Sequence, residues 1–538
     1  MGYWGEQFRN KIHFSANATP GTVVTPEAGS LSRCRAEVVS KVSQGVPGVT
    51  SVKKWESLFS TAAESAPAFN LKTEATPPTA SDTFDAYDAA LTAFCDFETR
   101  NTGGCDLTKV GTWRYAVDPA TEILCFGYRI AGVDHSLSPT SPSRNPLERL
   151  ASNSDMTFAC FGGFEQVIWQ KIMVERHGFP PIPTERWLDL RATCACFALP
   201  RALDKALAAL GLPIAKDKEG QRLVRSLSRP NRTGAYPEIT TLIDERVAAY
   251  NQIDIAALEA MMKQGLGRLD PAERKVWLLD QKINARGIAI DVGFVEAAKR
   301  ISDQVMGEAI EEFKALTGGL SPHQVQRIRE WLRDNHCALP NLEAETIEEA
   351  LESEGLPANV RRVLEIRQIA AAASLKKLDA MLACVGPDGR ARGLLQYHGA
   401  TTGRWSGQLI QPQNFPRPTL AVEVNPEELT AAVKTGDPDA LRRWGKPIDV
   451  LVSGLRHALT AADGAMLGAG DFSMIECCVL LALAGQQDKC ELIAQGVDVY
   501  RDMAATIYGL DRAAFMAIPE DQLSPEETER AASARTAS

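Results

Sequence analysis

Residues Ala89–Thr99 read AALTAFCDFET, and this apolar run leading into two carboxylates is the key to the architecture. Its length and apolar character predict a buried β-strand. Side chains two positions apart on a strand leave the same face, so we expect Asp96 and Glu98 to project together. Two adjacent carboxylates repel each other, and Mg²⁺, which takes oxygen ligands, would relieve that repulsion. The stretch therefore predicts a metal site, although an ordinary solvated strand end also fits an isolated D-x-E motif.

The segments around this strand predict a mixed α/β domain, with strands first and helices after them. Two further strands are expected at Thr112–Val117 and Ile123–Ile130. Helices are expected at Phe164–Val174, Leu203–Leu210 and Glu238–Met262. Residues 1–85 are rich in Ala, Ser, Thr, Pro and Val without a sustained period. They predict a disordered or low-complexity leader, which is either a functional tail or a spurious upstream extension.

The remainder of the chain is predicted to be mainly helical. Helices are expected at Pro271–Asn284 and Val292–Leu316, over most of Pro322–Leu382, around Val450–Leu459 and at Ile475–Ala484. Short strands are expected at Gly393–Tyr397 and Ala465–Phe472, and Gly287–Asp291 is a short apolar stretch between two of the helices. A G-P-D-G sequence at residues 386–389 predicts a β-turn, and a loop rich in Gly, Gln and Pro ends at Pro418.

Composition places the chain among globular proteins. Its 538 residues are 45 % hydrophobic and 23 % charged, which excludes collagen-like, fully disordered and disulfide-scaffold classes. No apolar run approaches the roughly 20 residues of a membrane span, and the N-terminus lacks a signal-peptide core. Twelve cysteines without a C-x-x-C pair fit neither a disulfide framework nor a zinc ribbon, so we expect a reducing cytoplasm.

The overall charge does not decide the partner. With 58 basic and 68 acidic residues the net charge is −10, which argues against non-specific coating of nucleic acid. Residues 376–417, however, contain six basic residues and two acidic ones. Because binding clefts are local, this segment can still face nucleic acid.

Three more residues could complete a metal site with Asp96 and Glu98. Glu165 opens a predicted helix, and Asp254 lies one helical turn after Tyr250. Two ions held about 3.5–4 Å apart could activate water and stabilise the leaving oxygen of a phosphodiester. The alternative for Tyr250 and Asp254 is an ordinary exposed helix face.

The order and spacing of these residues resemble the motifs of DEDD-type proofreading exonucleases. The matching segments are Cys95–Thr99, Phe164-Glu165 and Tyr250–Asp254. The metal ligands that the resemblance implies are Asp96, Glu98, Glu165 and Asp254. Tyr250 would orient the attacking water. The family commonly carries His-Asn where this chain has Cys160 and Phe161, and often Asp in place of Glu165.

A second group of residues lies in HGATTGRWSG, residues 398–407, followed by QPQNFP, residues 411–416. Gly403 and Gly407 permit close backbone approach, and Arg404 can meet a phosphate or a groove edge. The amides of Gln413 and Asn414 can donate to minor-groove acceptors, which discriminate sequence poorly. The pattern indicates a contact to a nucleic-acid duplex that does not depend on the base sequence. The alternative, a glycine-rich surface loop, would explain only the glycines.

T-G-R-x-S followed by Q-N-x-P resembles the signature of family A DNA polymerases, the bacterial polymerase I kind, and especially their phage and prophage branch. D-F-S-M-I-E at residues 471–476 resembles motif A of the same family. The primer–template contacts that the resemblance implies are Arg404, Gln413 and Asn414. Asp471 would bind the two catalytic Mg²⁺ ions, with Mn²⁺ as a possible substitute, and Glu476 would be the sugar gate. One departure is Cys478, where the family usually has Arg.

The resemblance implies an RNase H-like exonuclease domain at residues 86–265, a helical connector and thumb at 266–392, and a partial palm with the base of the fingers at 393–538. The implied activity is DNA-directed DNA synthesis with 3′–5′ editing, acting on a DNA primer–template and dNTPs in a bacterial host cytoplasm. Because no fingers helix or second acidic motif follows, we expect a truncated chain (a split gene, a frameshift or a fragment) that does not polymerise in isolation. The alternatives are a stand-alone 3′–5′ exonuclease and a non-catalytic DNA-binding part completed by a second chain.

Overall fold

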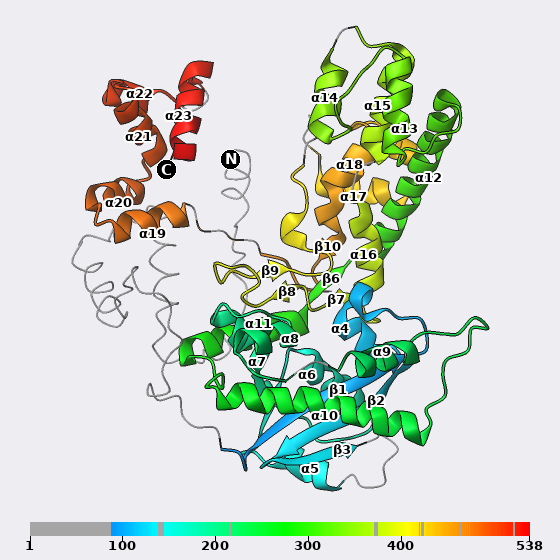
Figure 1. Cartoon of the computed structure of the whole chain (residues 1–538). Helices are drawn as coiled ribbons and strands as arrows, with labels where there is room; N and C mark the ends of the chain where they lie inside the picture. The colour runs from blue at the N-terminus through cyan, green and yellow to red at the C-terminus, as the bar shows by residue number, and fades with distance from the viewer. Residues whose placement is uncertain are drawn as a thin grey trace. The chain divides into compact units, whose positions relative to one another are not determined.

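The computed structural model describes residues 88–137, 145–214, 217–353, 355–370, 375–418, 420, 424–462, 464–468, 470, 472, 474–519 and 522–537. The chain forms two compact units (Figure 1). The described residues up to Leu467 belong to one unit, and those after it belong to the other. The leader predicted over residues 1–85 lies outside the described residues. The predicted divisions after residues 265 and 392 both fall inside the larger unit and stay predictions.

A five-stranded sheet organises the first part of the larger unit. Its strands are β1 (Thr92–Asn101), β2 (Thr121–Ile130), β3 (Val133–Leu137), β4 (Thr157–Cys160) and β5 (Trp187–Asp189). They lie in the order β3-β2-β1-β4-β5, with β1, β2 and β3 antiparallel and with β4 and β5 parallel to β1. The sheet, with the helices packed against it, confirms the predicted mixed α/β class.

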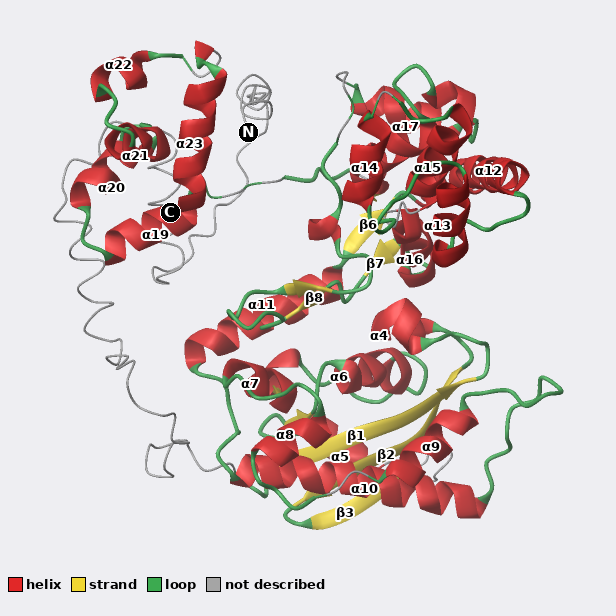
Figure 2. Cartoon of the chain, turned by 45° about the horizontal axis from the view of Figure 1, so that its top comes forward, coloured by secondary structure: helices red, strands yellow, loops and turns green. Residues whose placement is uncertain are grey.

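The alternation of side chains along β1 divides the core between the two faces of the sheet. Phe97 packs on one face with Phe126 of β2 and with Trp169, which begins the π-helical turn Trp169–Val174. Phe94 packs on the opposite face against α10 (Thr241–Lys263), which runs alongside the strands in both views (Figures 1 and 2). Asp96 is two positions from Phe94, so the strand directs it toward α10.

The other helices of this part flank the sheet (Figure 2). They are α4 (Leu107–Val117), α5 (Asn145–Ser152), α6 (Phe164–Ile168), α7 (Leu190–Cys196), α8 (Leu203–Ala209) and α9 (Lys218–Leu227). The predicted helices over Phe164–Val174, Leu203–Leu210 and Glu238–Met262 are confirmed within a few residues. The predicted strand at Thr112–Val117 is wrong, because that segment belongs to α4. The Asp106 side chain caps this helix by accepting a hydrogen bond from the Thr108 N–H.

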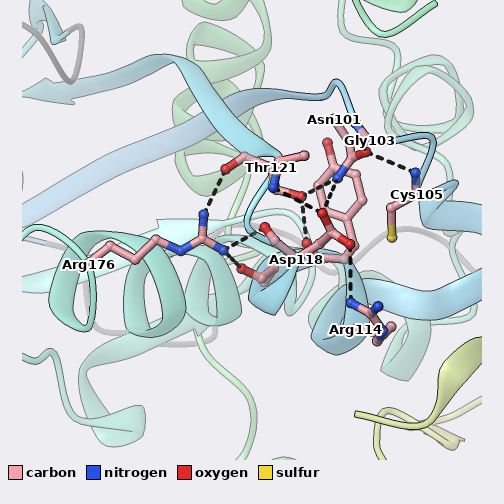
Figure 3. Close-up of polar contacts among 10 residues, drawn as sticks. Asn101, Gly103, Cys105, Arg114, Asp118, Thr121 and Arg176 are labelled. Carbon is pink, nitrogen blue, oxygen red and sulfur yellow. Dashed lines mark hydrogen bonds and ion pairs between the residues drawn. The ribbon is translucent and has the colours of Figure 1, made fainter. Parts of the chain in front are cut away.

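A network of polar contacts holds the end of β1, the end of α4 and the start of β2 together (Figure 3). The Arg176 guanidinium donates to the carbonyl oxygens of Ala116, Asp118 and Thr121 at 2.6, 2.8 and 2.9 Å. Burial alone would raise the pKa of Asp118, but bonds from the Ala120 N–H, from Asn101 and from Arg114 outweigh it and hold that pKa below its usual value. The carboxylate is therefore ionised and fixed in place near neutral pH.

The rest of the larger unit is mostly helical, as predicted. Its helices are α11 (Pro271–Arg286), α12 (Val292–Thr317), α13 (Val325–Asp334), α14 (Ala344–Glu352), α15 (Ala358–Ala370), α16 (Lys376–Cys384), α17 (Pro426–Lys434) and α18 (Pro447–Gly454). The short strands β6 (Ile288–Ile290), β7 (Arg390–Ala391) and β10 (Leu459–Thr460) form one sheet, and β8 (Leu395–Gln396) pairs with β9 (Ser406–Gly407). The predicted turn at residues 386–389 is confirmed by a 2.9 Å bond from the Gly389 N–H to the Gly386 carbonyl.

The described part of the other unit is helical. It contains α19 (Ile475–Leu483), α20 (Gln487–Ala494), α21 (Val499–Ile507), α22 (Arg512–Ala517) and α23 (Pro525–Ala537). The helix predicted at Ile475–Ala484 is confirmed. The strand predicted at Ala465–Phe472 is not formed by the described residues of that range, because they pair with no other strand. Among the described helices, none is long and apolar enough to cross a membrane.

Candidate metal-binding carboxylate site

Three of the predicted metal ligands meet in the structure. Ligand oxygens of Asp96 and Glu98 on β1 and of Asp254 on α10 all lie within 4.8 Å of one another. The side chains are partly exposed, so an ion could reach them from solvent. Because β1 and α10 are about 150 residues apart in sequence, the fold itself brings the three carboxylates together.

Asn251 fixes the position of Asp96, although the sequence motifs do not single it out. Its Nδ2 atom donates to Asp96 Oδ2 at 2.7 Å and to the Asp96 backbone oxygen at 3.2 Å. The approach of α10 depends on Gly127, the β2 residue that pairs with Asp96, because a Cβ atom there would lie 1.8 Å from Asn251 Oδ1. A glycine inside an otherwise apolar strand is the signal that marks such a close approach.

Glu165 lies at the start of α6, as predicted, and its side chain is buried. Its negative charge is among the causes that raise the pKa of Asp96, so the two carboxyl groups interact. Burial raises the pKa of Glu165 to about 7, and the charge of Asp189 adds to that increase. The Glu165 Oε2 atom has no hydrogen-bond partner, which leaves an oxygen available to a cation.

Tyr250 is buried on α10 one turn before Asp254. Burial, reinforced by the charges of Asp254, Glu98 and Asp96, raises the pKa of Tyr250 well above its usual value. Its ring packs against Gly220 of α9, where a Cβ atom would lie 2.6 Å from Tyr250 Cδ2. The phenol therefore keeps its proton and can act as a donor beside the carboxylates.

The electrostatics of the cluster fit a hard divalent cation. The pKa of Asp96 is raised well above its usual value, first by burial and then by the charges of Glu98, Glu165 and Asp254. A bound cation would reverse that effect by stabilising the ionised forms. The donors of the cluster formed by Asp96, Glu98 and Asp254 are all oxygens. Glu165, which is not part of that cluster, has one buried oxygen without a hydrogen-bond partner. Mg²⁺ prefers such donors, so the residues present fit this ion.

Two of the positions that depart from the exonuclease motif, Cys160 and Phe161, belong to the apolar interior. Cys160 ends β4, is fully buried, and donates from Sγ to the Gly162 carbonyl at 3.2 Å. Phe161 packs against the cluster that includes Phe94 and Leu258.

The predicted primer–template contacts lie on the surface of the larger unit. Arg404 is exposed in the connection between β8 and β9. Gln413 and Asn414 are exposed in the 3₁₀-helical turn Pro412–Asn414. Gly407 makes room for Gln413, because a Cβ atom at Gly407 would lie 2.0 Å from Gln413 Nε2.

The predicted polymerase carboxylate, Asp471, lies outside the described residues. Glu476 is exposed in the first turn of α19, and Cys478 lies in the same helix. The roles of all these residues stay predictions.

Comparison with known proteins agrees with the motifs. Over 423 residues the chain is 31 % identical to the DNA polymerase of Bacillus phage SP02, an alignment that covers 75 % of this chain and 63 % of the phage protein. The chain is related to a phage DNA polymerase. This relationship bears out the resemblance to family A polymerases of the phage type, although the chain spans less than two thirds of the relative's length.

No protein-family model matches the chain. Among solved structures, the polymerase domain of Pol1 from M. smegmatis, in complex with a DNA primer–template and dNTP, aligns with a TM-score of 0.45 and 17 % sequence identity. That alignment covers 77 % of this chain and 64 % of the other.

Proposed function

We propose that this chain acts as a DNA-directed DNA polymerase of the family A type in DNA replication or repair, and that its first part is a 3′–5′ exonuclease that edits the primer. The proposal of an editing activity rests on the carboxylates of Asp96, Glu98 and Asp254, whose ligand oxygens lie within 4.8 Å of one another. The observation that carries DNA synthesis is the 31 % identity to a phage DNA polymerase. Nucleotidyl transfer and phosphodiester hydrolysis both use acidic residues that hold Mg²⁺.

In the editing site, each residue has a separate task. Asp96, Glu98 and Asp254 would hold Mg²⁺, and Glu165 would complete the set. When bound there, Mg²⁺ supplies the positive charge that activates water and stabilises the leaving oxygen. Tyr250, which keeps its proton, would donate a hydrogen bond to the attacking water.

In the synthesis site, the contacts are proposed from the sequence motifs. Arg404 would neutralise a backbone phosphate, and the amides of Gln413 and Asn414 would read the minor groove without regard to sequence. Asp471 would hold Mg²⁺ beside the primer 3′ end and the incoming dNTP, and Glu476 would exclude a 2′-hydroxyl.

A nuclease assay tests the editing activity. The purified chain, supplied with Mg²⁺, should shorten a 5′-labelled single strand from its 3′ end. Asp96→Ala should reduce this to background, whereas Asp204→Asn, which changes an exposed carboxylate on α8, should leave it unchanged. Equal rates for the wild type and Asp96→Ala would show that the cluster is not a nuclease site.

Primer extension separates the proposal from its two alternatives. Extension of a primed template with dNTPs by the purified chain would support the polymerase and would contradict the expectation from the sequence that the chain does not polymerise in isolation. Arg404→Ala should weaken binding of the primer–template. Degradation without extension would favour a stand-alone 3′–5′ exonuclease. Extension only after addition of a second chain would favour the DNA-binding part of a split polymerase.

A further inference from the structure

A second group of potential metal ligands lies away from the carboxylate site. Cys196 is the last residue of α7, Glu273 lies in the first turn of α11, and His398 follows β8. Ligand atoms of these three residues all lie within 4.8 Å of one another. The three come from segments that are distant in sequence, and no motif in the sequence links them.

A chain of hydrogen bonds connects the group through Tyr397. The Tyr397 hydroxyl donates to Glu273 Oε2 at 2.5 Å, and it lies 3.0 Å from Cys196 Sγ. Since the hydroxyl gives its proton to Glu273, the Cys196 thiol must be the donor in the second contact. His398 Nε2 lies 3.6 Å from Glu273 Oε2. Without a cation the group is thus a protonated thiol, a phenol, a carboxylate and an imidazole.

The backbone around His398 is held in an unusual conformation. His398 has a φ of 48°, in the left-handed region that side chains other than glycine rarely adopt. Arg201 donates to the carbonyl oxygens of both Tyr397 and His398 and stabilises this bend. Gly403 leaves space for the imidazole, because a Cβ atom there would lie 3.2 Å from His398 Cε1. The bend at His398 and the space beside Gly403 leave the imidazole on the side of Glu273.

We infer that Cys196, Glu273 and His398 form a zinc-binding site, with a water molecule as the fourth ligand. Thiolate and imidazole are ligands that Zn²⁺ accepts in tetrahedral sites, and a single carboxylate completes such a set. Mg²⁺ prefers oxygen donors alone, so the group differs in kind from the carboxylate cluster. About two fifths of the Glu273 side chain is exposed, so solvent can supply the fourth ligand.

Zinc binding at this position would have a structural consequence. A cysteine binds Zn²⁺ as the thiolate, so binding at Cys196 must release a proton. The ion would connect α7 and α11 to the segment after β8, in which Arg404 lies. This inference does not depend on the proposed function, because it concerns different residues.

Cobalt binding tests the site in the full-length chain. Co²⁺ bound to a thiolate gives a sulfur-to-metal charge-transfer band, which carboxylates cannot produce. In the presence of excess Mg²⁺, the wild type should show this band with one Co²⁺ per chain. Cys196→Ser and His398→Gln should lose it, whereas Cys105→Ser, at another partly exposed cysteine, and Asp96→Ala should retain it. Absence of the band in the wild type, or its persistence in Cys196→Ser, would overturn the inference.

A measurement on the wild type alone guards against variants that fail to fold. Removal of zinc with a chelator should lower the midpoint of thermal unfolding, and stoichiometric Zn²⁺ in excess Mg²⁺ should restore it, with a shift of at least about 3 °C. An unchanged midpoint would show that the group is held by hydrogen bonds only.

Discussion

At the scale of single residues, the absence of a side chain is as important as the carboxylates. Gly127 pairs with Asp96 across β1 and β2, and its bare Cα allows Asn251 of α10 to lie against the strand. Asn251 in turn holds Asp96 by its carboxylate and its backbone oxygen. The geometry of the metal ligands therefore depends on two residues that would not bind the metal themselves.

Gly127→Ala should destabilise the fold. The added methyl would lie 1.8 Å from Asn251 Oδ1 and 2.7 Å from Ile255 Cδ1, so α10 would have to shift. Overpacking of this kind typically reduces the free energy of unfolding by about 1–3 kcal/mol, which denaturant titration measures. Gly307→Ala is the matched control. It lies in α12 with open space around it, and it should stabilise by roughly 0.5–1 kcal/mol. Equal effects of the two changes would contradict this account of Gly127.

The candidate site was predictable only in part. Asp96, Glu98, Glu165, Tyr250 and Asp254 carry motif spacing, so the sequence alone suggests them. Asn251 has no such signal, because its partner Asp96 is 155 residues away and the contact exists only after folding. The roles assigned to Arg404, Gln413, Asn414, Asp471 and Glu476 stay predictions.

At the scale of elements, helices and strands with long hydrophobic patterns were predicted correctly from the sequence, whereas one short segment was not. The long helix α10 and the strands β1 and β2 were predicted because their hydrophobic patterns extend over about ten residues or more. Thr112–Val117 was assigned to a strand, since six residues of mixed polarity fit either a strand or a helix. The side-chain cap from Asp106, which lies outside that window, shows that the helix starts earlier. For such short segments, a capping residue is therefore better evidence of a helix than the spacing of apolar residues is.

A buried carboxylate links α11 to the segment between β8 and β9. Asp280 Oδ1 accepts hydrogen bonds from Trp405 Nε1 at 2.9 Å and from Asn284 Nδ2 at 3.1 Å. Burial raises the pKa of Asp280 to about 6, although these bonds and one from Gln281 partly oppose the increase. Asp280 thus binds its proton more tightly in the folded chain than in the unfolded one.

The sign of the pH effect follows from this difference. Between about pH 4 and pH 6 the folded state holds more protons at Asp280 than the unfolded state does, so stability should fall as pH rises. Asp280→Asn keeps the acceptor for Trp405 and should remove that part of the pH dependence, a difference of about 1–3 kcal/mol across this range. Denaturation at several pH values measures it, with the exposed Asp303→Asn as control. A parallel pH profile for Asp280→Asn and the wild type would refute the assignment.

At the scale of the whole molecule, the residues on which the proposed function rests lie in both compact units. The larger unit contains the carboxylate cluster and the T-G-R segment, and the other contains α19 with Glu476. The order of the five strands was not predicted from local patterns, because strand pairing depends on contacts distant in sequence.

The most direct test of the proposed editing site is to locate its metal. Crystals of the chain soaked with Mn²⁺, a substitute for Mg²⁺, should show an anomalous scattering peak within coordination distance of Asp96, Glu98 and Asp254. The peak should disappear in Asp254→Asn crystals prepared in the same way. A wild-type map without a peak at these carboxylates would contradict the proposal that they form a metal-dependent nuclease site.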